Sequence, residues 1–238
     1  MRSAVLLMLV ACTPQADSGY LGEPLVSLRG QVVSSGDLPS LEAAMLWQRG
    51  DPPSTTDEEL ATLAPVQTGF PATFTVHLYQ PAPAAARRTL APGEPVWARA
   101  NAAAVPAGTP SSVVALLGGL AGAPTVPAAS GQYGIDPDHW VMYLASDVPR
   151  GSLTEWWLGA ALPAGFHLID VAVVNPSCIA ADELSACVAD LRARGVASDD
   201  AAKAFCLAPY RLSPAADGEE LKLQLGTVGL ASGGGSCP

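Results

Sequence analysis

The sequence predicts a mainly β protein, a β-sandwich with a small disulfide-closed helical hairpin inserted between two strands. Short runs of alternating apolar and polar residues recur along most of the chain, as in half-buried strands. The 22 prolines and 23 glycines among 238 residues punctuate the connections between these runs. Short strands with such connections are typical of β-sandwiches and partly open barrels. Helical spacing is clear in only one region, near the C-terminal end.

The first half of the chain contains four predicted strands. The first has an apolar face, formed by Val26, Leu28 and Val32 in alternation with polar residues. Gly30 falls on that face, and a glycine inside a strand often marks a close approach of a neighbouring chain. The second strand follows a Ser-Ser-Gly-Asp turn, the third has the cleanest alternation, and the alanine-rich fourth would also tolerate a helix. In order, they cover residues 26–32, 42–48, 74–79 and 96–104.

Two stretches rich in proline separate or follow these strands. Residues 49–71 contain four prolines and an acidic run, so we predict a long surface loop. Residues 100–135 hold four more prolines and carry no charged side chain. A membrane helix is not expected there, because the apolar run 113–117 is much shorter than a membrane span requires.

The second half adds three predicted strands and the helical hairpin. Residues 180–194 have apolar side chains at helical spacing, with acids in the first turn and arginines in the last. Gly195 follows this segment, as glycine often follows a helix. Ser198 is placed to cap a second helix over residues 199–206. The strands cover residues 139–145, 166–174 and 220–225.

Charge excludes one class of partner. The chain has 12 basic and 22 acidic side chains, a formal net charge of −10. A protein that binds nucleic acid needs a basic face, and the sequence contains no substantial Lys/Arg cluster. We therefore expect no nucleic-acid partner.

The N-terminus has the pattern of an export signal. Residues 1–3 include a positive charge, and residues 4–11 are uncharged and apolar. Eight apolar residues are too few to cross a bilayer, but they suit the central region of a secretory signal. Leu9-Val10-Ala11-Cys12 then closes this segment and resembles the lipobox of bacterial lipoproteins.

The resemblance implies that residues 1–11 are removed and that Cys12 carries lipid. Several acyl chains on one residue give stable membrane anchoring. Thr13 follows the cysteine, and the sorting rule of enterobacterial lipoproteins then implies the outer membrane. The alternative is a plain signal peptide, or an incorrect start codon, with Cys12 incidental.

The cysteine count agrees with lipidation. An odd number of cysteines in an exported protein needs an explanation, and a lipid on Cys12 leaves four for two disulfides. In an antiparallel helical hairpin Cys187 and Cys206 lie about equally far from the turn, so we predict that they pair. Cys178 is then left for Cys237. The crossed pairing of 178 with 206 and 187 with 237 stays open, whereas 178 with 187 would have to bridge about 13 Å along a helix.

The expected organisation is a single domain behind a tether. The opening Leu-Arg-Gly-Gln-Val, which contains Gly30, and the strand tryptophan Trp47 loosely resemble transthyretin-like and immunoglobulin-like domains of predicted envelope lipoproteins. This resemblance implies the sandwich fold and transfers no site residue. The expected parts are a signal peptide 1–11, a lipidated tether 12–23, a β domain 24–230 that contains the hairpin 178–206, and a tail 231–238.

No catalytic motif stands out. The sequence has neither a nucleophile elbow nor a phosphate-binding loop, and we predict no catalytic residue, no metal ligand and no cofactor. His77, His139 and His167 are interpreted as scattered surface or strand-end residues, and residues 136–139 as a proline turn that leads into a strand. Trp156-Trp157 could form a stacking platform for a sugar or a peptide. Their leucine neighbours make a role in covering the core the better interpretation.

Together these observations predict an outer-membrane-anchored lipoprotein whose folded part is a non-catalytic binding or structural module of the cell envelope. The expected partners are the membrane, through the lipid on Cys12, and an envelope protein or ligand that the sequence does not identify. The alternatives are a periplasm-facing hydrolase without a recognisable motif and a subunit of an envelope machine.

Overall fold

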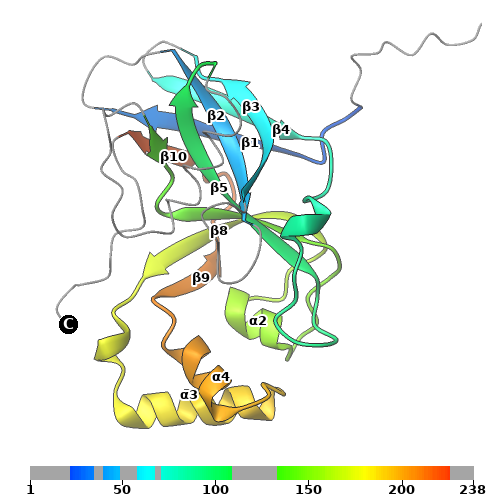
Figure 1. Ribbon diagram of the computed structural model, residues 1–238, viewed down its shortest axis with the longest axis vertical. Coiled ribbons are helices and arrows are strands. Elements are labelled where there is room, and N and C mark those ends of the chain that lie inside the picture. Colours follow the sequence, from blue (N-terminus) through cyan, green and yellow to red (C-terminus); the bar gives the residue numbers. More distant parts are fainter. Residues whose placement is uncertain (1–21, 35–39, 49–57, 68–70, 109–132, 226–238) are drawn as a thin grey trace, which may run out of the picture.

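The computed structural model describes residues 22–34, 40–48, 58–67, 71–108 and 133–225. Within them, ten strands form one open sheet, and three α-helices lie at one end of it (Figure 1). The prediction of a mainly β protein is confirmed. The predicted β-sandwich, which requires two separate facing sheets, is not confirmed. The strands are β1 (Val26–Val33), β2 (Leu41–Gln48), β3 (Glu58–Pro65), β4 (Ala72–Leu78), β5 (Trp97–Pro106), β6 (Gly134–Ile135), β7 (His139–Leu144), β8 (Gly165–Val173), β9 (Tyr210–Pro214) and β10 (Leu221–Leu225).

The sheet brings together segments that are distant in the sequence. The main path runs β4-β1-β10-β6-β5-β7-β8-β9, and β2 leaves it by pairing with both β5 and β3. The first strand therefore lies between β4 and β10, the last described strand. The pair β1–β10 is parallel, and the other named pairs are antiparallel.

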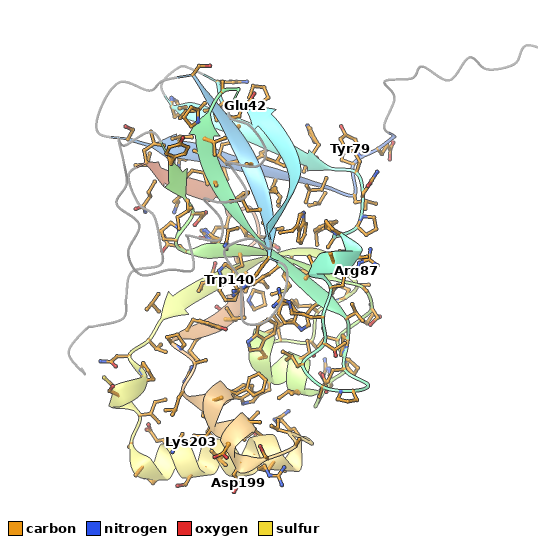
Figure 2. The ribbon with its side chains drawn as sticks, in the orientation of Figure 1. Glu42, Tyr79, Arg87, Trp140, Asp199 and Lys203 are labelled. Carbon is orange, nitrogen blue, oxygen red and sulfur yellow. A yellow bond between two sulfur atoms is a disulfide. The ribbon has the colours of Figure 1, made fainter. Side chains whose placement is uncertain are left out.

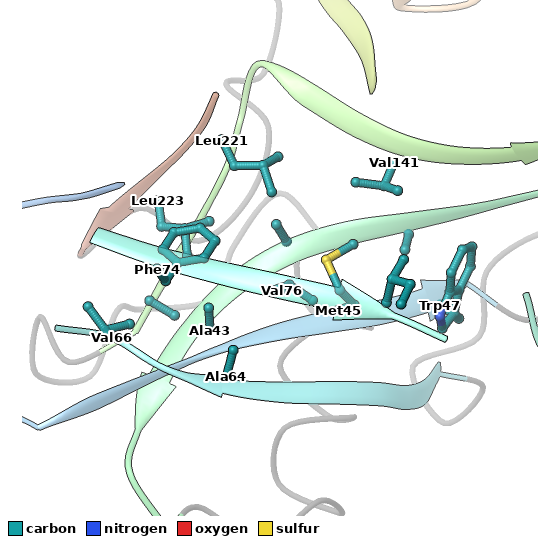
Figure 3. Close-up of a cluster of buried hydrophobic side chains, with 14 of the residues drawn as sticks. Ala43, Met45, Trp47, Ala64, Val66, Phe74, Val76, Val141, Leu221 and Leu223 are labelled. Atoms are coloured by element: carbon teal, nitrogen blue, oxygen red, sulfur yellow. The ribbon is translucent and has the colours of Figure 1, made fainter. Parts of the chain in front are cut away.

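The larger core gathers apolar side chains from strands β1 to β5, β7 and β10 (Figure 3). Residues just past β3 approach β4, where the Gln67 amide donates to the Thr73 carbonyl at 2.8 Å. Side chains on both faces of β2 are buried, with Met45 in this larger core and Leu46 in a second cluster on the other face. Other large side chains in this core are Trp47, Phe74, Val76, Leu221 and Leu223.

One prediction was wrong. Residues 49–71 contain β3 and are not one continuous surface loop. The prolines explain why the strand was missed and why it can nevertheless form. Pro65 is the last residue of β3 and Pro71 lies between β3 and β4, so neither interrupts a ladder from within. Among the described strands β3 pairs only with β2, so it lies at an edge of the described sheet, where a terminal proline is tolerated.

The other predicted strands are present within a residue or two of the expected bounds, but β6, β9 and one helix were not anticipated. The strand β6 has two residues, and β9 contains a proline at its end. The helix α2 (Leu153–Leu158) is only six residues long. Segments this short carry little periodic signal, and their pairing and packing partners determine them instead.

The helical hairpin is present as predicted. The helices α3 (Ala181–Ala193) and α4 (Asp199–Cys206) lie between β8 and β9 in the chain. The Ser198 hydroxyl caps α4 by accepting from the Ala201 amide at 3.1 Å, and Gly195 has a positive φ of 95° after α3. No helix in the described residues has both the length and the apolar run that a membrane crossing requires.

The predicted disulfide between Cys187 and Cys206 is confirmed, with a Cα–Cα distance of 6.1 Å. It joins the two helices at the level that the hairpin geometry predicts. Cys178 is also disulfide-bonded. Its predicted partner, Cys237, lies outside the described residues.

The tryptophans of β5, β7 and α2 connect the sheet to the helical end. Trp140 lies near the middle of the molecule, whereas Glu42 and Asp199 lie at opposite ends (Figure 2). The Arg99 guanidinium stacks over the Trp140 ring, 3.9 Å from its centroid. Trp97 packs against Trp157 of α2, with ring centroids 4.5 Å apart.

A partly buried carboxylate, that of Glu94, holds the start of α2. Glu94 accepts hydrogen bonds from the Leu153 amide at 3.0 Å, the Thr154 amide at 2.9 Å and the Thr154 hydroxyl at 2.7 Å. Burial acts to raise the pKa of Glu94, but these three hydrogen bonds together lower it below 4.5. The interaction therefore stabilises the fold above the unfolded-state pKa, and the stabilisation is lost as the pH falls through the folded-state pKa.

We expect Glu94→Gln to lower the free energy of unfolding by about 1 kcal/mol at neutral pH. Glutamine keeps the shape of the side chain but has only one acceptor oxygen. The Leu153 amide and the two Thr154 donors use both oxygens of the Glu94 carboxylate. The difference from the unsubstituted protein should shrink towards pH 3, and urea denaturation at both pH values measures it. The exposed Glu23→Gln is the control. A Glu94→Gln difference that is the same at both pH values would contradict this account.

Candidate functional site

The candidate site is centred on His139, the first residue of β7. Its side chain is only 3% exposed, although it sits at the end of a strand. The sequence placed His139 at a strand end but gave no sign of its burial. Because His139 pairs with Asp170 in the β7–β8 register, the imidazole lies beside a second strand.

Asp136 holds one side of the imidazole. Its carboxylate is fully buried and lies 2.9 Å from His139 Nδ1. The same carboxylate accepts from the backbone amides of Asp138 and His139 at 2.9 and 3.0 Å, which makes the predicted turn. It also accepts from the Lys222 amide of β10 at 2.7 Å. Asp136 therefore orients the ring and joins the turn before β7 to β10.

Two more carboxylates face the other ring nitrogen. Asp170 Oδ1, on β8, lies 3.5 Å from His139 Nε2, and Glu219 Oε1, just before β10, lies 3.4 Å from it. The other Glu219 oxygen accepts from the Ala216 amide at 3.2 Å, which fixes the turn. Both distances to Nε2 exceed those of ordinary hydrogen bonds.

Asp170 Oδ1 is buried and has no hydrogen-bond partner within the described part of the chain. Buried acceptors are nearly always satisfied, so such an atom requires an explanation. The Asp170 side chain as a whole is 41% exposed and that of Glu219 is 30% exposed. The cluster is thus closed on the His139 side and open to solvent on the carboxylate side.

The cluster shifts two protonation equilibria. The hydrogen bond to Asp136 raises the pKa of His139 above 6.5, against the opposing effect of burial, and Glu219 adds to the rise. Burial raises the pKa of Asp170 above 3.8, and repulsion from Glu219 raises it further. The site therefore concentrates negative charge around one imidazole.

One nitrogen and two carboxylate oxygens, from His139, Asp170 and Glu219, lie within 4.8 Å of one another. Imidazole and carboxylate are donors for divalent metal ions, and they also transfer protons. The local pair of Asp136 and His139 is visible in the sequence as a three-residue spacing. The sequence does not show that Asp170 and Glu219 belong to the site, because only strand pairing brings them close to His139.

The other two histidines do not join this cluster. His77, on β4, lies 2.8 Å from the Ser27 hydroxyl of the neighbouring β1, on the exposed face. The Nε2 atom of His167, on β8, lies 2.8 Å from the Pro163 carbonyl oxygen. The three histidines are scattered over the structure.

Trp156 and Trp157 face different packing clusters. Trp157 packs with the sheet residues around Trp97, whereas Trp156 packs with the helical hairpin, edge-on to Phe205. Both rings are partly buried. Their arrangement covers two cores and does not bring the two rings together as one stacking platform. Cys12, the predicted lipidation site, lies outside the described residues.

Compared with family models, curated proteins and solved structures, the chain matches none.

Proposed function

We propose that the protein is a lipoprotein anchored in the bacterial outer membrane, with a folded part that serves as a non-catalytic binding or structural module of the cell envelope. The lipobox residues Leu9-Val10-Ala11-Cys12 provide the anchor in this proposal. The observation that supports export most directly is the Cys187–Cys206 disulfide, because such bonds persist in oxidising compartments and are rare in the cytosol.

The cysteine count supports the same conclusion. Cys187 and Cys206 are paired, and Cys178 is disulfide-bonded. If Cys178 pairs with Cys237, four of the five cysteines are used and Cys12 is left for the lipid. Lipidation thus explains the odd number without a free thiol in an oxidising compartment.

The packing of the tryptophans supports a module whose aromatic residues stabilise the fold. We also propose that the open sheet of the described residues belongs to a sandwich of the transthyretin-like or immunoglobulin-like type.

The second candidate function is that of a periplasm-facing hydrolase. The His139 cluster favours it, because a buried histidine oriented by a carboxylate is a common acid–base element.

Cys12→Ala tests the anchor. We expect the variant to leave the membrane fraction, because a single apolar stretch of eight residues cannot hold the chain in a bilayer. Cell fractionation measures the change, and Thr13→Ser, which keeps the four lipobox residues, should remain with the membrane. The intact mass of the unsubstituted protein, extracted in detergent, should correspond to a chain that begins at Cys12 and carries acyl groups. An unacylated chain, or a Cys12→Ala variant that stays tightly membrane-bound, would refute the proposal.

A further inference from the structure

We propose that His139, Asp170 and Glu219 bind a divalent transition-metal ion of the zinc type, with one coordination position left open. The ligand atoms are His139 Nε2, Asp170 Oδ1 and Glu219 Oε1. They come from β7, β8 and the turn before β10, so the pairing of the sheet strands fixes their positions. This inference concerns the folded part alone and does not depend on the lipid anchor.

The spacing of the three atoms fits a metal better than direct hydrogen bonds. The Nε2 atom lies 3.4 Å from Glu219 Oε1 and 3.5 Å from Asp170 Oδ1. Hydrogen bonds from a ring nitrogen to a carboxylate are shorter, about 2.7–3.0 Å. Two ligands at about 2.0–2.1 Å from a tetrahedral zinc ion lie roughly 3.3–3.4 Å apart. The two carboxylate oxygens lie within 4.8 Å of each other, so both can approach the same ion.

Asp136 supplies the support that metal-binding histidines usually have. In metal sites the second ring nitrogen of a histidine generally donates to a carboxylate or a carbonyl, which fixes the ring and its tautomer. Asp136 lies 2.9 Å from His139 Nδ1, and three backbone amides hold its carboxylate in place. With Nδ1 protonated, the lone pair of Nε2 is directed at Asp170 and Glu219.

A cation also explains the unpartnered oxygen and the charge. Asp170 Oδ1 is buried without a hydrogen-bond partner in the described residues, and a metal ion would provide the missing partner. Three carboxylates, those of Asp136, Asp170 and Glu219, surround a single imidazole. A divalent cation would offset the repulsion among them, and the partly exposed carboxylates give it a route from solvent.

The donor set selects among metals. Calcium takes six to eight oxygen ligands and magnesium favours an octahedron of oxygens. An imidazole nitrogen beside two carboxylates instead suits zinc and its neighbours in the first transition series. Three protein ligands leave a fourth tetrahedral position for water or an external ligand.

The test uses the detergent-extracted full chain after removal of metals with a chelator. Added Zn²⁺ should bind with a stoichiometry of one and raise the melting temperature by roughly 5–10 °C at about 100 times its dissociation constant. Ca²⁺ at the same concentration should not. Co²⁺ should give the visible absorption of a tetrahedral site.

Asp170→Asn and Glu219→Gln remove ligands at partly exposed positions, where the fold should tolerate the change. Each should weaken Zn²⁺ binding at least about tenfold and abolish the tetrahedral Co²⁺ spectrum. Glu220→Gln, which removes the same charge at the next, exposed position, should bind like the unsubstituted protein. The proposal is overturned if the unsubstituted chain shows no Zn²⁺-dependent melting shift, or if Asp170→Asn and Glu219→Gln retain its affinity and spectrum. These readouts are independent of membrane fractionation, so failure of the anchor and failure of the metal site are distinguishable.

Discussion

Gly30→Ala should lower the free energy of unfolding by about 3 kcal/mol, towards the upper end of the range for overpacked cores. A Cβ atom at this position would lie 2.3 Å from Phe74 Cζ and 2.7 Å from the Leu221 carbonyl oxygen. The Phe74 ring is packed in the core, and the Leu221 carbonyl belongs to the backbone of the neighbouring strand. Neither neighbour can therefore move away from the added Cβ atom without disturbing the packing or the sheet. Thermal denaturation should show a fall of roughly 6–12 °C in the melting temperature.

The expected cost comes from space and not from backbone conformation. Gly30 pairs with Phe74 across β1–β4 and with Leu221 across β1–β10, so both neighbours lie at its own level in the sheet. The aromatic ring covers the glycine, a pairing that offsets the poor packing of glycine within a strand.

A second glycine, Gly93, distinguishes the cost of steric overlap from the cost of backbone conformation. Gly93 has a positive φ of 86° and open space around the position of a Cβ. Gly93→Ala should therefore cost only the 1–2 kcal/mol or so of a left-handed alanine. In addition, Phe74→Leu should destabilise the Gly30→Ala protein less than it destabilises the unsubstituted one, because the smaller side chain relieves part of the overlap. Equal costs for Gly30→Ala and Gly93→Ala would refute the close approach.

The same glycine shows what local sequence can reveal about this fold. A glycine on the apolar face of a strand predicts a close neighbour, and the structure identifies Phe74 and Leu221 as the neighbours. Alternation likewise located most strands, and helical spacing with caps located α3, α4 and their disulfide. Each of these features is encoded within a few consecutive residues or within one hairpin.

Features that depend on distant pairing were not predicted. The two residues of β6 form a strand only because β5 and β10 lie on either side of them. The candidate site has the same origin. Asp136 and His139 are close in sequence, but Asp170 and Glu219 reach them only through β8 and the turn before β10. No local sequence pattern marks Asp170 or Glu219 as a neighbour of His139, although the fold places all four residues in one cluster.

Asp136→Ala should lower the free energy of unfolding by about 3–5 kcal/mol, because it removes a buried charge and leaves its partners without an acceptor. The carboxylate accepts from the Lys222 amide where the two-residue strand β6 ends, and from the amides of Asp138 and His139 in the turn. Water has little access to replace it, since the Asp136 side chain is fully buried. Denaturant unfolding should show the loss as a lower midpoint.

A neighbouring acid supplies the control. Asp138 lies in the same turn with an exposed side chain, so Asp138→Ala should change the free energy of unfolding by less than about 0.5 kcal/mol. If both variants lost a comparable free energy of unfolding, the negative charge of the turn would be responsible, and the buried hydrogen bonds of Asp136 would not. The expected large difference would show that Asp136 is first a structural residue. It joins two parts of the chain that are far apart in sequence, and in doing so it fixes the imidazole that faces Asp170 and Glu219.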